Sequence, residues 1–109
     1  ANKVVLVAEE GNVMHGFGQL DPGTQVIEAV YVAPGATRKG IGSAILRELE
    51  RQAVSSSVPK LTLDASLNAE QFYALHGYVA TARTGHELRP GIVLPCVRMS
   101  KRLHVHVGR

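Results

Sequence analysis

The first part of the chain carries short apolar runs separated by turn residues, the pattern of β-strands. Residues 3–9 are rich in Val and Leu and end at Glu10-Gly11-Asn12, and a second apolar run follows over residues 13–20. These two runs predict a hairpin. Gly16 and Gly18 occupy alternate positions of the second run, so one face of that strand is bare backbone that could receive a ligand or a bulge.

A third strand is predicted over residues 25–32, after the turn sequence Asp21-Pro22-Gly23. It ends at Ala33-Pro34-Gly35, because proline cannot donate to a strand ladder. The next segment changes period: Ile41, Ile45, Leu49 and Ala53 recur at helical spacing, with charged residues between them, and predict an amphipathic helix over residues 41–55.

The remaining elements are shorter. Residues 61–65 predict a strand, which would lie parallel to the third one across the helical crossover. Residues 68–76 predict a second helix, with Asn68 as N-cap, Gln71 at the capping-box position and Gly77 as the left-handed stop.

Two final strands are predicted over residues 78–84 and 92–102, around Arg89-Pro90-Gly91. Pro95 makes the last of them an edge or bulged strand. The predicted fold is therefore an α/β domain with a mixed, largely antiparallel sheet, a central parallel β-α-β crossover and two helices.

Composition narrows the class of protein. The 109 residues are expected to form a single domain, and they are 45% hydrophobic and 19% charged, as in ordinary soluble proteins. The apolar runs fall short of a membrane span, and no leader pattern opens the chain, so a cytoplasmic location without a membrane partner is expected. The lone Cys96 reads as a small buried hydrophobe, and no metal is implied.

Charge favours anionic ligands without indicating nucleic acid. Twelve Lys and Arg against nine Asp and Glu give a formal charge of +3, and aromatic residues make up only 5% of the chain. Single-strand binding needs interleaved aromatic and basic residues, which are absent from the sequence. A basic nucleic-acid-binding domain is therefore a minor alternative, and no nucleic-acid partner is expected.

The turn between the third strand and the first helix has the composition of an anion site. Arg38 and Lys39 precede Gly40-Ile41-Gly42, and the helix begins there. The first N–H groups of a helix lack intrahelical acceptors and add to the positive end of its dipole, so a pyrophosphate can bind to backbone alone. A tight turn without a ligand would give the same sequence.

This turn, followed by Ser66-Leu67-Asn68-Ala69, Phe72-Tyr73 and Gly77-Tyr78, resembles the GNAT superfamily of acyl-CoA-dependent N-acyltransferases over nearly the whole chain. The family signature is Gln or Arg, two residues, Gly, one residue, then Gly or Ala. Gly40 and Gly42 match it, whereas Thr37 stands where Gln or Arg is expected. The resemblance implies acetyl-CoA as co-substrate and direct acetyl transfer to an amine, without an acyl-enzyme.

The resemblance also implies roles for particular residues. Tyr73 matches the tyrosine that protonates the departing thiolate, although ordinary helix packing is the alternative. Glu28 lies where some members carry a catalytic carboxylate, and a solvated sheet face is the alternative. The cofactor-binding residues implied are Tyr31, Val32, Thr37, Arg38, Lys39, Gly40, Ile41, Gly42, Ser43 and Asn68, the last of which could be a helix cap only.

Members of this family usually begin with a strand and one or two helices that help form the acceptor groove, and this chain begins at what resembles their second strand. The acceptor, a small-molecule amine or a peptide, is not readable from the sequence. A CoA-binding or interaction module without turnover is the alternative function. Exposed strand edges need covering, so a homodimer is expected.

Overall fold

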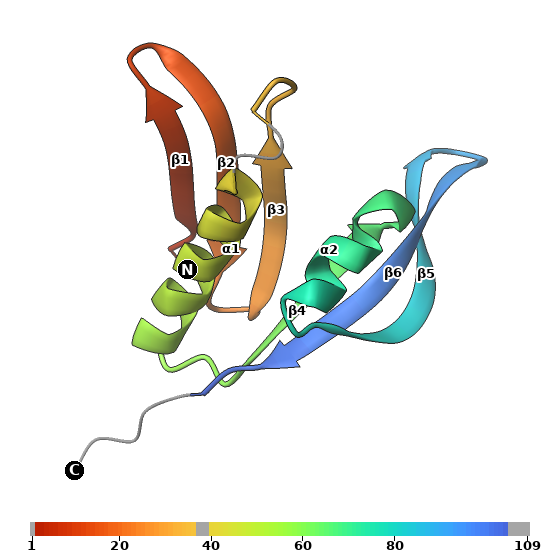
Figure 1. Cartoon of the computed structure of the whole chain (residues 1–109). Coiled ribbons are helices and arrows are strands. Elements are labelled where there is room, and N and C mark those ends of the chain that lie inside the picture. The colour runs from red at the N-terminus through yellow and green to blue at the C-terminus, as the bar shows by residue number, and fades with distance from the viewer. Residues whose placement is uncertain (1, 37–39, 105–109) are drawn as a thin grey trace. The chain divides into compact units, whose positions relative to one another are not determined.

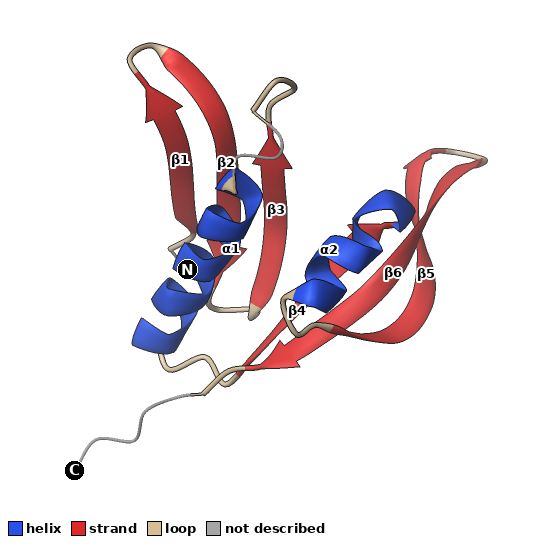
Figure 2. Ribbon diagram, in the orientation of Figure 1, coloured by secondary structure: helices blue, strands red, loops and turns tan. Residues whose placement is uncertain are grey.

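The computed structural model describes residues 2–36 and 40–104. Its strands follow the order β1-β2-β3-β4-β6-β5 in a six-stranded sheet, which is mostly antiparallel with one parallel pair (Figures 1 and 2). The mixed sheet with two helices predicted from the sequence is confirmed. The chain divides into two compact units, residues 1–61 with 103–109 and residues 62–102.

The first unit contains three antiparallel strands and the longer helix. The strands are β1 (Val4–Glu10), β2 (Val13–Asp21) and β3 (Val26–Val32), and α1 spans Ile41–Ser55. The β1–β2 hairpin closes at Gly11, whose φ of +61° suits a residue without a β-carbon. The predicted strands and the predicted helix are all present in this unit.

Helix α1 covers the bare face of β2. A β-carbon built on Gly18 would lie 2.5 Å from Ile45 Cγ2 and 2.9 Å from Leu49 Cδ1. One built on Gly16 would lie 3.3 Å from Ile41 Cγ2 and 2.6 Å from the carbonyl oxygen of Tyr31. The glycine face is covered by the helix, because only backbone leaves room for its apolar side chains. The bulge alternative also finds support, since the ladders of β2 shift register beside Gly16, between Ala8 and Glu9, and beside Gly18, between Gln19 and Leu20.

The core of this unit follows the helical period. Along α1 the buried residues are Ile45, Leu46, Leu49 and Ala53. On the strands, Leu20 and Ile27 are buried and oppose each other in the β2–β3 ladder. Burying such side chains is the main favourable term in folding, at roughly 1.5–3 kcal/mol each.

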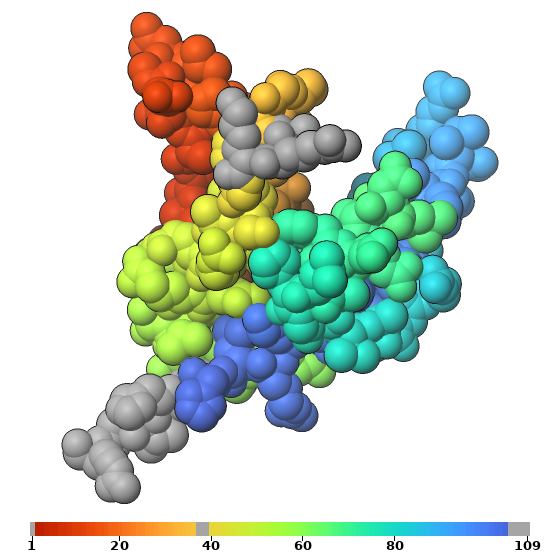
Figure 3. All heavy atoms as spheres, viewed as in Figure 1, coloured from red at the N-terminus to blue at the C-terminus, as the bar shows by residue number. Residues whose placement is uncertain are grey.

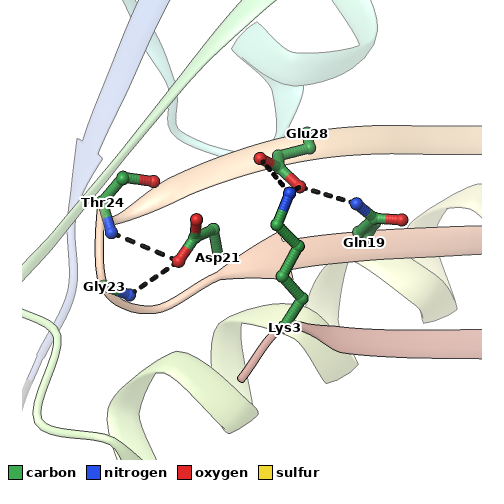
Figure 4. A network of polar contacts seen from close by, with 6 residues as sticks. All are labelled: Lys3, Gln19, Asp21, Gly23, Thr24 and Glu28. Carbon is green, nitrogen blue, oxygen red and sulfur yellow. Dashed lines mark hydrogen bonds and ion pairs between the residues drawn. The ribbon is translucent and has the colours of Figure 1, made fainter. Parts of the chain in front are cut away.

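The turn between β2 and β3 is held by the buried Asp21. Its Oδ1 accepts hydrogen bonds from the backbone N–H of Gly23 at 2.9 Å and of Thr24 at 3.3 Å (Figure 4). This side-chain turn confirms the sequence prediction and leads directly into β3.

The second unit contains a short strand, a short helix and a long hairpin. Its elements are β4 (Lys60–Ser66, which begins in the first unit), the 3₁₀ turn η1 (Leu67–Ala69), α2 (Glu70–Leu75), β5 (Val79–Arg89) and β6 (Ile92–Arg102). Helix α2 ends in a Schellman motif: Tyr78 N–H donates to Tyr73 O, Gly77 N–H donates to Ala74 O, and Gly77 has φ +92°. The predicted glycine stop is confirmed.

The predicted start of the second helix is wrong. Residues 67–69 form a 3₁₀ turn, and α2 itself begins at Glu70 with Ala69 as its N-cap and without a side-chain cap bond. Asn68 therefore caps nothing at this helix, and Gln71 does not occupy a capping-box position. The 3₁₀ turn occupies residues 67–69, and the sequence pattern assigned residues 68 and 69 to the helix.

Of the two alternatives predicted from Pro95, the edge strand is wrong, since β6 lies between β4 and β5. The ladder of β6 with β5 is irregular at two places, between Ala80 and Ala82 and between Glu87 and Arg89. Leu103 N–H donates to Pro59 O, and Arg98 forms an ion pair with Asp64. Both contacts fit one antiparallel register of β4 and β6, in which the last residue of β4, Ser66, lies opposite Cys96. Pro95 lies just past the end of β4, where its missing N–H disrupts no pairing on that side. The edge strand beside β6 is β5.

Candidate functional site

The strand-to-helix turn presents glycine backbone at the start of α1. Gly40 is the N-cap, with φ +73° and ψ 11°, a left-handed conformation that glycine adopts without strain. Among the described residues, no atom lies within 4 Å of the position that a β-carbon on Gly40 would take. Ile41, Gly42 and Ser43 follow as the first turn of the helix.

The electrostatics of this helix end suit an anion. The first turn of α1 contains no acidic residue. The N-cap, Gly40, has no side chain that could accept a hydrogen bond from the N–H groups of this turn. Thr37, Arg38 and Lys39, which the sequence assigned to cofactor binding, lie outside the described residues. What the structure contributes here is the backbone of a helix N-terminus that can face a phosphate.

The end of β3 lies beside this helix start. Val32, its last residue, opposes Gly16 of β2, and the same glycine position approaches both Tyr31 O and the Ile41 side chain. The structure therefore places Tyr31 and Val32 beside the first turn of α1, and their role in binding a cofactor stays a prediction. Tyr31 is 42% exposed, and the centroid of its ring lies 5.5 Å from that of the Phe17 ring.

Glu28 of β3 lies in a polar network with Gln19 of β2 and with Lys3, the residue that precedes β1 (Figure 4). Its Oε1 accepts a hydrogen bond from Gln19 Nε2 at 2.6 Å and lies 3.0 Å from Lys3 Nζ. These contacts, with Gln19 contributing most, hold the pKa of Glu28 below its ordinary value. The carboxylate is thus ionised at neutral pH and is a weaker base than an unpaired one.

Tyr73 is the buried residue of α2. Its side chain packs edge-on against Phe72 at 5.1 Å and against Tyr78 at 5.8 Å between ring centroids. Burial raises the pKa of the phenol, so Tyr73 holds its proton across the physiological range. Leu75, two residues further along α2, is 78% exposed.

Some partners of these residues cannot be found by sequence pattern. Lys3 and Gln19 contact Glu28 only because the strand registers bring them there, and Phe17 meets Tyr31 for the same reason. The only sequence signal for the aromatic pair is that Phe17, between two glycines facing α1, must point to the opposite face of β2.

The fold and the helix-end site define an acetyltransferase domain of the GNAT type. The model of the Acetyltransferase (GNAT) domain family matches residues 1–103, so the chain belongs to this family. No helix in the described part of the chain is both long and apolar enough to cross a membrane. No curated protein matches the chain.

Several solved structures share the fold. A GCN5-related N-acetyltransferase of Rhodopseudomonas palustris is 33% identical with a TM-score of 0.86, over 93% of this chain and 62% of that protein. The Salmonella typhimurium protein yncA, solved with its cofactor acetyl-CoA, is 26% identical with a TM-score of 0.72, over 96% of this chain and 67% of that protein.

A ribosomal-protein-alanine N-acetyltransferase of Brucella melitensis is 29% identical, with a TM-score of 0.73 over 91% of this chain and 68% of that protein. This chain therefore spans about two thirds of the length of the solved structures that it resembles.

Proposed function

We propose that this chain transfers an acetyl group from acetyl-CoA to a primary amine. The observation that carries the proposal is the opening of β3 into α1 through Gly40, in a chain that belongs to the GNAT family. The related yncA structure holds acetyl-CoA, which supports the same co-substrate for this chain.

The residues at the start of α1 fit the diphosphate of this co-substrate. Gly40 and Gly42 let the backbone approach phosphate oxygens, and Ile41 and Ser43 contribute N–H groups of the first turn. The charges of Arg38 and Lys39 would add to that attraction, with Thr37 at the start of the turn. Tyr31 and Val32, beside this turn, would offer backbone groups to the pantetheine amides. Asn68 is proposed as a further contact of the co-substrate.

Acetyl-CoA, when bound, supplies a thioester whose carbonyl carbon an amine attacks directly, so that a C–N bond forms and the C–S bond breaks. We assign the general acid to Tyr73, which gives the proton of its hydroxyl group to the departing sulfur. The raised pKa supports this role because the phenol is protonated at neutral pH. The same burial also suits a packing role, so activity must decide between them.

Glu28 is proposed as the group that accepts the proton of the amine. Its ionised state supports proton acceptance, while its lowered pKa reduces the driving force for that transfer. An acceptor that arrives as a neutral amine would need no dedicated base. The acceptor class remains a small-molecule amine or a peptide amine, and neither membrane nor nucleic acid is proposed as a partner.

Calorimetric titration with acetyl-CoA tests the co-substrate directly. Gly42→Glu places bulk and negative charge in the first turn of α1 and is expected to abolish binding. Ser56→Glu places the same charge at the other end of α1 and is expected to leave binding intact. Failure of the folded parent chain to bind acetyl-CoA would overturn the proposal.

A CoA-binding module without turnover is the second candidate, favoured by the pairing of Glu28 with Gln19 and Lys3. It predicts the same binding result without thiol release. Monitoring free thiol in a screen of amine acceptors, from polyamines to peptide N-termini, separates the two functions.

A further inference from the structure

The edge strand β5 is long and accessible. It contains eleven residues, of which all except Thr84 are exposed, and it ends the strand order. Within the part of the chain that the structure describes, no strand pairs with its outer side. The tip of the hairpin that it forms with β6 projects as a narrow arm, light blue in Figure 3.

Apolar side chains gather near the tip of this arm. The exposed ones are Leu88, Ile92, Val93 and Leu94. A long exposed edge with nearby apolar side chains is a template for pairing with another strand, and native proteins normally block or cover it. The ladder of β5 with β6 shifts register between Ala80 and Ala82 and between Glu87 and Arg89, so the regular part of this edge, open to a further strand, is residues 82–87.

We infer that β5 pairs antiparallel with β5 of a second copy of this chain, on a two-fold axis at Gly85. The two outermost strands of a sheet are β1 and β5, and only β5 carries side chains of both signs at suitable spacing. The charges on β1, Glu9 and Glu10, are both negative and offer no complementary partner to a second copy.

The charges on β5 select one register. Arg83, Gly85 and Glu87 alternate along the strand and so lie on one face. With Gly85 opposite Gly85 of the second copy, each Arg83 lies opposite a Glu87, twice per dimer. Shifting the centre to residue 83 would place two Arg83 side chains opposite each other, and such like-charge pairs are unfavourable.

Packing around Gly85 fits the same centre. A β-carbon built on Gly85 would lie 2.5 Å from Val93 Cγ1, so the exposed Val93 side chain of β6 leans over the glycine toward the edge. Directly opposed residues in an antiparallel pair have Cα atoms about 4.5–5.5 Å apart. The two Val93 side chains would then approach each other above the glycine pair, in a self-complementary contact.

Ion pairs within one chain do not replace this arrangement. Arg83 Nη1 lies 3.7 Å from Glu70 Oε1 of α2, and Glu87 accepts a long hydrogen bond of 3.4 Å from Gly91 N–H. Both contacts are weak and exposed, which leaves both charges able to pair across the edge. The inference is independent of acetyl transfer, because it concerns only the β5–β6 hairpin.

Sedimentation velocity over a range of protein concentrations tests it. The parent chain is expected to dimerise, and Arg83→Glu or Glu87→Arg alone to raise the dimer dissociation constant about tenfold or more, because each creates two like-charge pairs. The double variant with both substitutions restores opposite charges and is expected to recover dimerisation.

Glu70→Gln is the matched control, since it removes the contact of Arg83 within its own chain and is expected to leave the dimer intact. Circular dichroism reports whether each variant is folded. A parent chain that stays monomeric at all concentrations overturns the inference. So do a dimer that tolerates both single changes and a folded double variant that stays dissociated.

Discussion

Gly18 lies directly beneath Ile45, so that a β-carbon on the glycine would stand 2.5 Å from Ile45 Cγ2. The contact sets how closely α1 approaches the sheet of the first unit. At Gly16 the nearest atom is backbone, the carbonyl oxygen of Tyr31 at 2.6 Å. Gly16, whose β-carbon would also lie 3.3 Å from Ile41 Cγ2, is where the start of α1 meets the end of β3.

Replacing either glycine by alanine should destabilise the chain through overpacking. We expect Gly18→Ala to cost ~1–3 kcal/mol in the free energy of unfolding, and Gly16→Ala to cost more because a carbonyl group moves less easily than a side chain. Urea denaturation measures both. Val13→Ala, at an exposed position of the same strand, should change stability by no more than about 0.5 kcal/mol; equal costs for all three variants would contradict the packing account.

Removing the Tyr73 hydroxyl should lower turnover without disturbing the fold. The ring contacts with Phe72 and Tyr78 remain in Tyr73→Phe, so stability and acetyl-CoA affinity should change little. A lost general acid lowers kcat by about 10²–10⁴-fold. Tyr78→Phe, at a neighbouring buried tyrosine, is the control. Unchanged kcat in Tyr73→Phe would leave that residue a packing role only.

The role of Glu28 is testable through its partner Lys3. If Glu28 is the base, Glu28→Gln lowers kcat, and the acid limb of the pH profile reports its lowered pKa. Lys3→Met removes a hydrogen bond and a favourable charge, so the pKa of Glu28 should rise and the acid limb should move to higher pH. A profile that does not move, with kcat unchanged in Glu28→Gln, assigns the carboxylate to strand pairing.

Helix α1 carries an acid-sensitive group on its exposed face. Hydrogen bonds from Arg51, and next from Gln52, lower the pKa of Glu48 to about 2, below its ordinary 4.5. A depressed pKa means that Glu48 adds stability above pH 4.5, which is lost as the pH falls toward 2. Thermal unfolding of the parent chain and Glu48→Gln should therefore differ at pH 6 and converge near pH 2; a gap that is constant with pH would contradict this.

We expect glycine substitutions at the C-terminal ends of α1 and α2 to change stability in opposite directions. Ser57 has φ +61° after α1, and Gly77 has φ +92° after α2. A left-handed conformation costs a residue with a β-carbon about 1–2 kcal/mol. Ser57→Gly should therefore raise the melting temperature and Gly77→Ala should lower it. Calorimetry of both variants checks the pair, and a shift of the same sign in both would count against it.

Local features of the chain were determined by its sequence alone. The spacing of Ile41, Ile45 and Leu49 predicts α1 and its buried face, because an α-helix brings side chains to the same face about every 3.6 residues whatever it packs against. Gly77 marks the end of α2 for an equally local reason, its positive φ. The glycine motif at Gly40 and Gly42 pointed to the GNAT family, which the family model then confirmed.

Tertiary structure alone decided what those elements contact. Strand register gave Glu28 its partners Gln19 and Lys3 and so lowered its pKa, and packing buried Tyr73 while exposing Leu75. It also placed α1, rather than a ligand, over Gly16 and Gly18. Such outcomes depend on residues distant in the chain meeting in space. The local pattern predicts which strands form, but the individual side chains that face one another follow from the register of the assembled sheet.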